Sequence, residues 1–191
     1  METVSQNTCF GGTQGVFTHA SKACACDMTF GLFLPPEAQD GPVPVLWYLS
    51  GLTCTHENAM VKAGAQGWAA EQGIALVFPD TSPRGDDVAN DDAFDLGQGA
   101  GFYVNATQKP WAPHFKMWDY IADELPAVLV DTGTSDQFME LLRPETLANA
   151  MAAKRQEGMV RMQKGYDHSY FFMSTFMEDH VAFHAEALHA G

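Results

Sequence analysis

An aspartate and a histidine late in the chain have the residue types and the order that acid–base chemistry requires. Asp136 lies in the segment GTSD, residues 133–136, and His168 lies in GYDH, residues 165–168. Each segment follows a short apolar run that is typical of a strand, and reactive groups in α/β sheets lie at the carboxyl ends of strands. His168 is predicted to act as a general base toward a hydroxyl group. Asp136 is predicted to fix the histidine tautomer and to stabilise the imidazolium.

A loop earlier in the chain has a position suited to stabilising an oxyanion. The apolar run PVLWYLSG, residues 44–51, leads directly into Leu-Thr-Cys. A backbone N–H group in such a loop can stabilise the oxygen that becomes charged during acyl transfer. A second carboxylate, Asp167, adjoins His168 in sequence, and we expect it to make a local turn hydrogen bond instead of orienting the ring.

Strand patterns indicate how these loops are positioned. Residues 14–21 and 24–34 are predicted as an antiparallel pair, because apolar residues alternate in the second segment. Continuous apolar runs at 44–51 and 74–78 indicate strands that are buried on both faces. Short strands are also expected at 128–130 and 159–163.

Helical segments alternate with these strands. The first helix is predicted at residues 58–72, although Gly64 and Gly67 lower the helix propensity of this segment. The long irregular stretch 81–113 exceeds the usual loop length, which favours a functional role. Further helices are expected at 115–125, 136–157 and 171–189. The order predicts an α/β fold with a mostly parallel sheet flanked by helices and antiparallel strands at the N-terminus, in a single domain, residues 1–191.

The charge and the cysteines exclude several classes of function. Acidic residues outnumber basic ones by 24 to 10, giving a net charge of −14. Nucleic-acid binding needs the opposite balance, so no nucleic acid is expected as a partner. No apolar run approaches the roughly 18 residues that cross a bilayer, and the N-terminus is unlike a signal peptide. Four cysteines without a Cys-x-x-Cys pair predict a reduced, cytoplasmic protein.

Five segments in the same order resemble those of the S-formylglutathione hydrolase family, the esterase D family of α/β-hydrolases. They are LSGLTCTHEN, SPRG, GQGAGFYVNAT, DTGTSDQF and GYDHSYFF, and the resemblance runs from QGVF near the start to the final helix. It implies hydrolysis of S-formylglutathione to glutathione and formate, with small esters as side substrates. It also implies homodimers and no metal or organic cofactor.

The resemblance assigns roles to particular residues. Asp136 and His168 match the acid and the base of a Ser…Asp…His triad. Leu52 matches the loop that donates an oxyanion-hole amide, and Cys54 matches a thiol close to the active site. Gly51, beside Leu52, and Trp111, in the long irregular stretch, are expected to line the substrate pocket.

The chain departs from the family where the nucleophile should be. The family carries its serine in Gly-His-Ser-Met-Gly-Gly, a form of the G-x-S-x-G elbow, and no such motif occurs in the 191 residues. Leu125-Pro126-Ala127 joins Val128-Leu129-Val130 directly, so we infer an internal deletion with its seam near 127/128. The loss of a central strand predicts exposed strand edges, poor stability or oligomerisation. Two readings therefore remain open: a hydrolase, or an inactive remnant that binds ligands of that family.

Other residues offer weaker candidates for the nucleophile. Ser50 is expected to point into the structure, while Ser135 and Ser169 adjoin the proposed acid and base too closely in sequence to face them. Cys54 is the best substitute in principle because a thiolate is intrinsically nucleophilic. A small thiol that lines a pocket is nevertheless the favoured interpretation of Cys54.

Metal and nucleotide sites are not favoured by the remaining motifs. His180 and His184 have helical spacing but no evident third ligand, so we expect packing or surface histidines. The segment GQGAG, residues 97–101, lacks the spacing of a dinucleotide loop and is expected to give backbone freedom beside the substrate. No metal is predicted.

Overall fold

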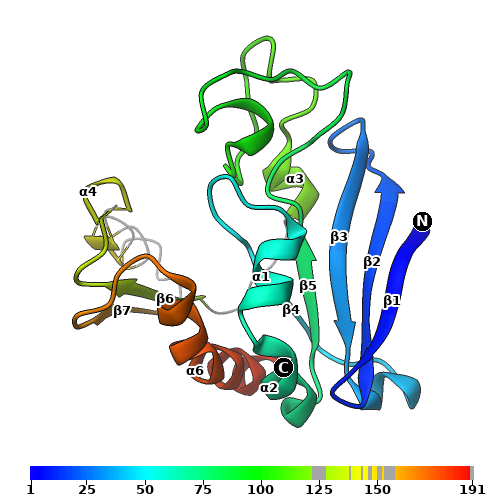
Figure 1. The fold of residues 1–191 in the computed structure, drawn as a ribbon, viewed down its shortest axis with the longest axis vertical. Helices are drawn as coiled ribbons and strands as arrows, with labels where there is room; N and C mark the ends of the chain where they lie inside the picture. Colours follow the sequence, from blue (N-terminus) through cyan, green and yellow to red (C-terminus); the bar gives the residue numbers. More distant parts are fainter. Residues whose placement is uncertain are drawn as a thin grey trace.

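The computed structural model describes residues 1–121, 128–137, 139–142, 144–145, 148–149, 152 and 158–189. The predicted seam at Ala127, and parts of the predicted helices 115–125 and 136–157, lie outside these residues. The described strands form two sheets (Figure 1). The first has five strands in the order β1 (Glu2–Cys9), β2 (Gly12–Ala20), β3 (Asp27–Leu34), β5 (Ala75–Pro79) and β4 (Val45–Trp47), and the second pairs β6 (Val128–Gly133) with β7 (Gly158–Gln163).

The strands combine antiparallel and parallel pairing. The pairs β1–β2, β2–β3 and β3–β5 are antiparallel, whereas the pairs β4–β5 and β6–β7 are parallel. The antiparallel N-terminal strands confirm the prediction, whereas among the described strands only these two pairs are parallel. β1 was not predicted, because all but its last residue are exposed and no alternation of burial reveals it. The turn at Phe10 and Gly11, both with positive φ, joins it to β2.

The helices cover the sheet and connect its strands. The predicted helix 58–72 is two helices, α1 (His56–Lys62) and α2 (Ala65–Gln72), because Gly64 adopts a left-handed conformation with φ 68° between them. The other described helices are α3 (Met117–Ile121), α4 (Met139–Leu142) and α6 (Tyr170–His189), with short 3₁₀ turns at η1 (Pro36–Gln39) and η2 (Gly97–Gly99).

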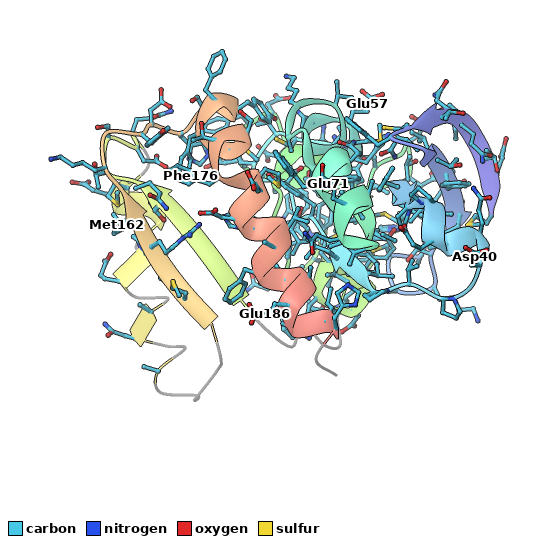
Figure 2. The ribbon with its side chains drawn as sticks, turned by 90° about the horizontal axis from the view of Figure 1, so that it is seen from below. Asp40, Glu57, Glu71, Met162, Phe176 and Glu186 are labelled. Atoms are coloured by element: carbon cyan, nitrogen blue, oxygen red, sulfur yellow. The ribbon has the colours of Figure 1, made fainter. Side chains whose placement is uncertain are left out.

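One apolar core joins the five-stranded sheet to the closing helix. Phe33 and Phe78 from the sheet pack in a buried cluster with Met177, Val181 and Ala185 of α6. Figure 2 shows α6 between the β6–β7 pair and the helices that cover the sheet. Because α6 begins two residues after His168, this core fixes where the predicted base lies.

β4 is only partly buried, contrary to the prediction for residues 44–51. Val45 is 41% exposed, and Trp47 is only half-buried. In β5, by contrast, every residue is buried, as predicted. β5 lies between β3 and β4, whereas β4 has no second neighbour among the described residues. The local sequence indicated the strand correctly, but its burial depends on a neighbour that the described sheet lacks.

Candidate active site

Asp136 and His168, the predicted acid and base, lie within hydrogen-bond distance of each other. Asp136 Oδ2 lies 2.8 Å from His168 Nδ1. An ionised carboxylate can only accept, so Nδ1–H donates and the neutral ring carries its lone pair on Nε2. The Asp136 side chain is 2% exposed while that of His168 is 49% exposed. The carboxylate is therefore shielded, and the ring that would transfer the proton is open to solvent.

The parallel pairing of β6 and β7 brings these two residues together from distant parts of the sequence. The strands run in register to Gly133 and Gln163, so the loops that follow them start at the same sheet end. Ser135 N–H donates to the Tyr166 carbonyl at 2.9 Å, and Gly165 N–H donates to Thr134 Oγ1 at 2.9 Å. These bonds tie the acid-bearing loop to the base-bearing loop.

Gly133 is required at the junction of these two loops. A Cβ atom at this position would overlap the Tyr166 carbonyl. Only glycine lets the end of β6 approach the loop that carries His168 this closely.

The predicted oxyanion loop is shaped by contacts with the glycine-rich segment. Thr53 has φ 62°, and its N–H donates to the Gly99 carbonyl at 2.8 Å. Gly101 packs so closely on Gly51 and Leu52 that a Cβ there would lie 3.1 Å from the Leu52 Cα. Within the described part of the chain, no acceptor pairs with the Leu52 N–H. The Thr53 amide is therefore already used, and the role of the Leu52 amide in an oxyanion hole stays a prediction.

A buried carboxylate holds the same loop from the other side. Asp80 is 6% exposed and accepts from Arg84 Nε at 3.0 Å. Arg84 Nη2 also donates to the Cys54 carbonyl at 2.9 Å, and Thr81 Oγ1 donates to the same oxygen. His56 Nδ1 lies 3.9 Å from the second Asp80 oxygen, too far for a hydrogen bond.

Tyr170 connects the oxyanion loop with the segment that carries the base. Its hydroxyl lies 3.7 Å from Cys54 Sγ, and the Lys62 ammonium lies 4.7 Å from the centre of its ring. Burial raises the pKa of the Tyr170 phenol, and the contact with Cys54 raises it further. The phenol is therefore a neutral link between the two parts of the site.

The structure also places the weaker nucleophile candidates. Ser50 is buried, and its carbonyl accepts from the Tyr103 hydroxyl at 2.6 Å. Ser169 caps α6, since its Oγ accepts from the Phe172 N–H. Ser135 is exposed beside Asp136, and Asp167 is exposed as well. The carboxylate within hydrogen-bond distance of the His168 ring is that of Asp136.

Trp111, predicted to line the substrate pocket, packs against another aromatic side chain. Its half-buried ring packs edge-on against Phe115, with ring centres 5.4 Å apart. Its contact with substrate therefore stays a prediction.

Metal-binding and membrane-spanning features were searched among the described residues. No three histidine, cysteine, aspartate or glutamate side chains there are grouped to hold a metal ion, and no helix there is long and apolar enough to cross a bilayer. Burial, together with the neighbouring His180, lowers the pKa of His184 to about 4. His184 is therefore a packed, neutral ring at physiological pH.

The supporting residues Asp80, Tyr103 and Tyr170 were not singled out from the sequence as parts of the site. Arg84 lies in SPRG and Tyr170 lies in GYDHSYFF. Both segments were used for the family resemblance, but no role was predicted for these two side chains. The contacts of Arg84, Tyr103 and Tyr170 with residues 50–54 span 30, 53 and 116 positions of sequence, which no local pattern reveals.

Comparison with known proteins identifies the family. The model of the Esterase family matches residues 21–130. The S-formylglutathione hydrolase of Paracoccus denitrificans is 46% identical over 273 aligned residues, which span 98% of this chain and 98% of that protein. This chain belongs to the S-formylglutathione hydrolase family. Among solved structures, an S-formylglutathione hydrolase from Agrobacterium tumefaciens matches with a TM-score of 0.90 at 34% identity, covering 98% of this chain and 100% of that chain.

More distant structures share only the fold with this family member. The fluorophosphonate-binding serine hydrolase F of Staphylococcus aureus matches with a TM-score of 0.60 at 12% identity, over 91% of this chain and 98% of that one. The α/β-hydrolase fold expected from the motifs is thus confirmed by the family match.

The alignment also supports the internal deletion in this family member. It extends over 273 positions, whereas this chain has 191 residues, so at least 82 aligned positions of the Paracoccus protein have no counterpart here. Both chains are nevertheless matched almost end to end, which places the missing positions inside the chain.

Proposed function

We propose that this chain hydrolyses small acyl thioesters and esters, with S-formylglutathione as the principal substrate. The observation that carries the proposal is the 2.8 Å hydrogen bond between Asp136 and His168. It is supported by the Leu52 amide, which has no acceptor among the described residues, and by the 46% identity to a protein named S-formylglutathione hydrolase.

The chemistry follows from the groups that the chain retains. Because the G-x-S-x-G serine is missing from the sequence, His168 takes a proton from water and the resulting hydroxide attacks the thioester carbonyl. The Leu52 N–H stabilises the oxyanion. The C–S bond then breaks, and the imidazolium returns its proton to the leaving thiolate, giving a carboxylic acid and a thiol. Without a serine this route is slow, although a site that lacks one triad member typically retains about 10³- to 10⁴-fold catalysis over water.

The test is turnover of S-formylglutathione and p-nitrophenyl acetate by the purified chain. His168→Asn should lower the rate by about 10²- to 10⁴-fold, the range expected of general acid–base catalysis. Asp167→Asn is the matched control, because it removes a neighbouring exposed carboxylate outside the pair. No turnover above background, or equal rates in the chain and in His168→Asn, would refute the proposal.

A second candidate is an inactive member of the family that binds its ligands. The missing serine motif favours it. It predicts that glutathione thioesters bind and are recovered intact, which isothermal titration followed by mass spectrometry of the ligand would show. Recovered thiol and carboxylate would exclude it.

Two further expectations remain proposals. We place the chain in the cytoplasm, because its four cysteines are free in the structure and show no disulfide pattern. We also propose that it forms homodimers, by analogy with the family. Sedimentation velocity over a range of concentrations tests the second.

A further inference from the structure

The ammonium group of Lys62 lies beside the predicted site without a charged partner. It is 4.7 Å from the centre of the Tyr170 ring, and the side chain is exposed on the last turn of α1. Among the described residues, no carboxylate pairs with this ammonium and no carbonyl accepts a hydrogen bond from it. Lysines in the last turn of a helix commonly bind its terminal carbonyls. Lys62 is instead directed across to the first residue of another helix.

The Tyr170 ring connects this cation to the predicted oxyanion loop. Tyr170 is the first residue of α6 and follows His168 by two positions, and its hydroxyl lies 3.7 Å from Cys54 Sγ. Figure 2 shows α1, marked by Glu57, next to the beginning of α6. A cation over an aromatic face is held by the ring quadrupole. Lys62 Nζ is therefore no farther from the Cys54 thiol than the length of an extended tripeptide, about 10 Å.

The charge of the rest of the chain gives an unpaired cation at this place a particular effect. The net charge of −14 repels anionic ligands. Arg84 and Arg161 are each paired with an aspartate, and Lys116 donates to a backbone carbonyl. These three cations are therefore already used within the fold. An anion that approaches the oxyanion loop still meets an attractive group at Lys62.

The ligand proposed for this chain is such an anion. A glutathione thioester carries two carboxylates and one amino group, and both carboxylates lie within the length of a tripeptide from its sulfur. The proposed chemistry places that sulfur beside Leu52, which is two residues before Cys54. A carboxylate of the same ligand can then reach the Lys62 ammonium.

We propose that Lys62, held over the Tyr170 ring, binds a carboxylate of the glutathione portion of the substrate. This contact makes the site selective for anionic thioesters over neutral esters of similar size. The inference rests on the proposed function for the class of ligand, and it adds the residue that distinguishes this ligand from other acyl compounds. Lys62 is a binding residue and takes no part in the proton transfers.

A purely structural role for Lys62 predicts a different behaviour. The ammonium would then only complement the dipole of α1 and stack on the Tyr170 ring. Removing its charge would lower the stability of the chain slightly and would leave the selectivity for ligands unchanged. Affinities for a charged and an uncharged form of one ligand therefore separate the two roles.

The experiment measures binding to the full 191-residue chain by isothermal titration at low ionic strength. The probes are S-methylglutathione, a thioether that cannot be hydrolysed, and its diethyl ester, in which both carboxylates are blocked. Lys62→Gln should weaken binding of S-methylglutathione by about three- to fivefold, the range of an exposed ion pair. The affinity for the diethyl ester should not change. The difference between the two probes should shrink at high salt, because salt screens the pair.

Three further variants test the charge and the ring. Lys62→Arg should retain the selectivity, since a guanidinium also stacks on aromatic rings and binds carboxylates. Lys22→Gln is the matched control, because it removes the same charge from an exposed lysine on the connection between β2 and β3. It should bind both probes like the unmodified chain. Tyr170→Leu should lose part of the selectivity, because the ammonium is then no longer held over a ring.

The outcomes separate this inference from the proposed function. Equal losses for the two probes, or equal losses in Lys62→Gln and Lys22→Gln, overturn the inference, and so does the absence of measurable S-methylglutathione binding. Selective binding that depends on Lys62, without turnover of thioesters, supports the inference and argues against the proposed chemistry. Turnover that His168→Asn removes, with unchanged affinities in Lys62→Gln, supports the chemistry and overturns the inference.

Discussion

β4 and β5 are parallel neighbours with similar apolar sequences, yet they differ sharply in burial. Every residue of β5 is buried, whereas in β4 only Leu46 is. Phe78 on β5 is fully buried, and Val45 on β4 is 41% exposed. Propensity and apolar content are nearly the same for both, so the difference comes from the number of neighbouring strands. A strand's contribution to stability is therefore set by its place in the sheet.

Phe78→Ala on β5 should have the largest effect on stability. Phe78 is fully buried between the sheet and the core that includes α6, so its truncation leaves a cavity and should lower the free energy of unfolding by about 3–5 kcal/mol. Urea denaturation followed by circular dichroism measures the change. A loss as small as that of Val45→Ala would show that β4 and β5 do not differ in the way their burial indicates.

Leu46→Ala sharpens the comparison within β4 itself. Leu46 is 8% exposed and belongs to the same core as Phe78. The substitution should therefore lower the free energy of unfolding by about 2–3 kcal/mol. This is at the low end for buried leucines, because β4 lies at the sheet edge. The same denaturation experiment applies. A negligible change in the free energy of unfolding would mean that neither face of β4 packs against the core.

The pH dependence of stability tests whether α6 shares the core of β5. Burial lowers the pKa of His184 from 6.5 to about 4, so between these values the unfolded chain binds more protons than the folded one. The contribution of His184 should be fully present above about pH 6.5 and should be lost as the pH falls toward 4. His184→Gln should flatten the pH dependence in this window, measured by urea denaturation at several pH values. If His184→Gln leaves the slope of the unfolding free energy against pH unchanged, the His184 ring is exposed to solvent.

Val45→Ala should have the smallest effect. The exposed side chain makes few contacts, so its truncation should change the free energy of unfolding by no more than about 0.5–1 kcal/mol. Urea denaturation measures the change, and a loss as large as that of Leu46→Ala would contradict the exposure of Val45.

Much of the fold and part of the site followed from local sequence. Asp136 and His168 were singled out because each follows an apolar strand in a polar, glycine-containing loop and because the surrounding motifs resemble those of the family; the structure places the two side chains 2.8 Å apart. The burial of β4 was predicted wrongly. A run of apolar residues indicates that a strand suits a buried position, but it does not indicate how many strands lie beside it. β1 escaped prediction because a fully exposed edge strand carries no alternation. Arg84, held by Asp80, reaches the Cys54 carbonyl across 30 positions of sequence, so geometry alone reveals this support.

The opposite edge of the five-stranded sheet has a consequence for how the protein assembles. β1 is lined by polar residues, and its pairing with β2 is interrupted by an irregularity between Thr3 and Ser5. Both features discourage a further strand from adding there. Among the described strands, β4 is thus the only open side of this sheet, and a sheet with one open side stops growing after one addition. Crowded molecules of this chain should accordingly form small, closed complexes through this sheet and not fibres.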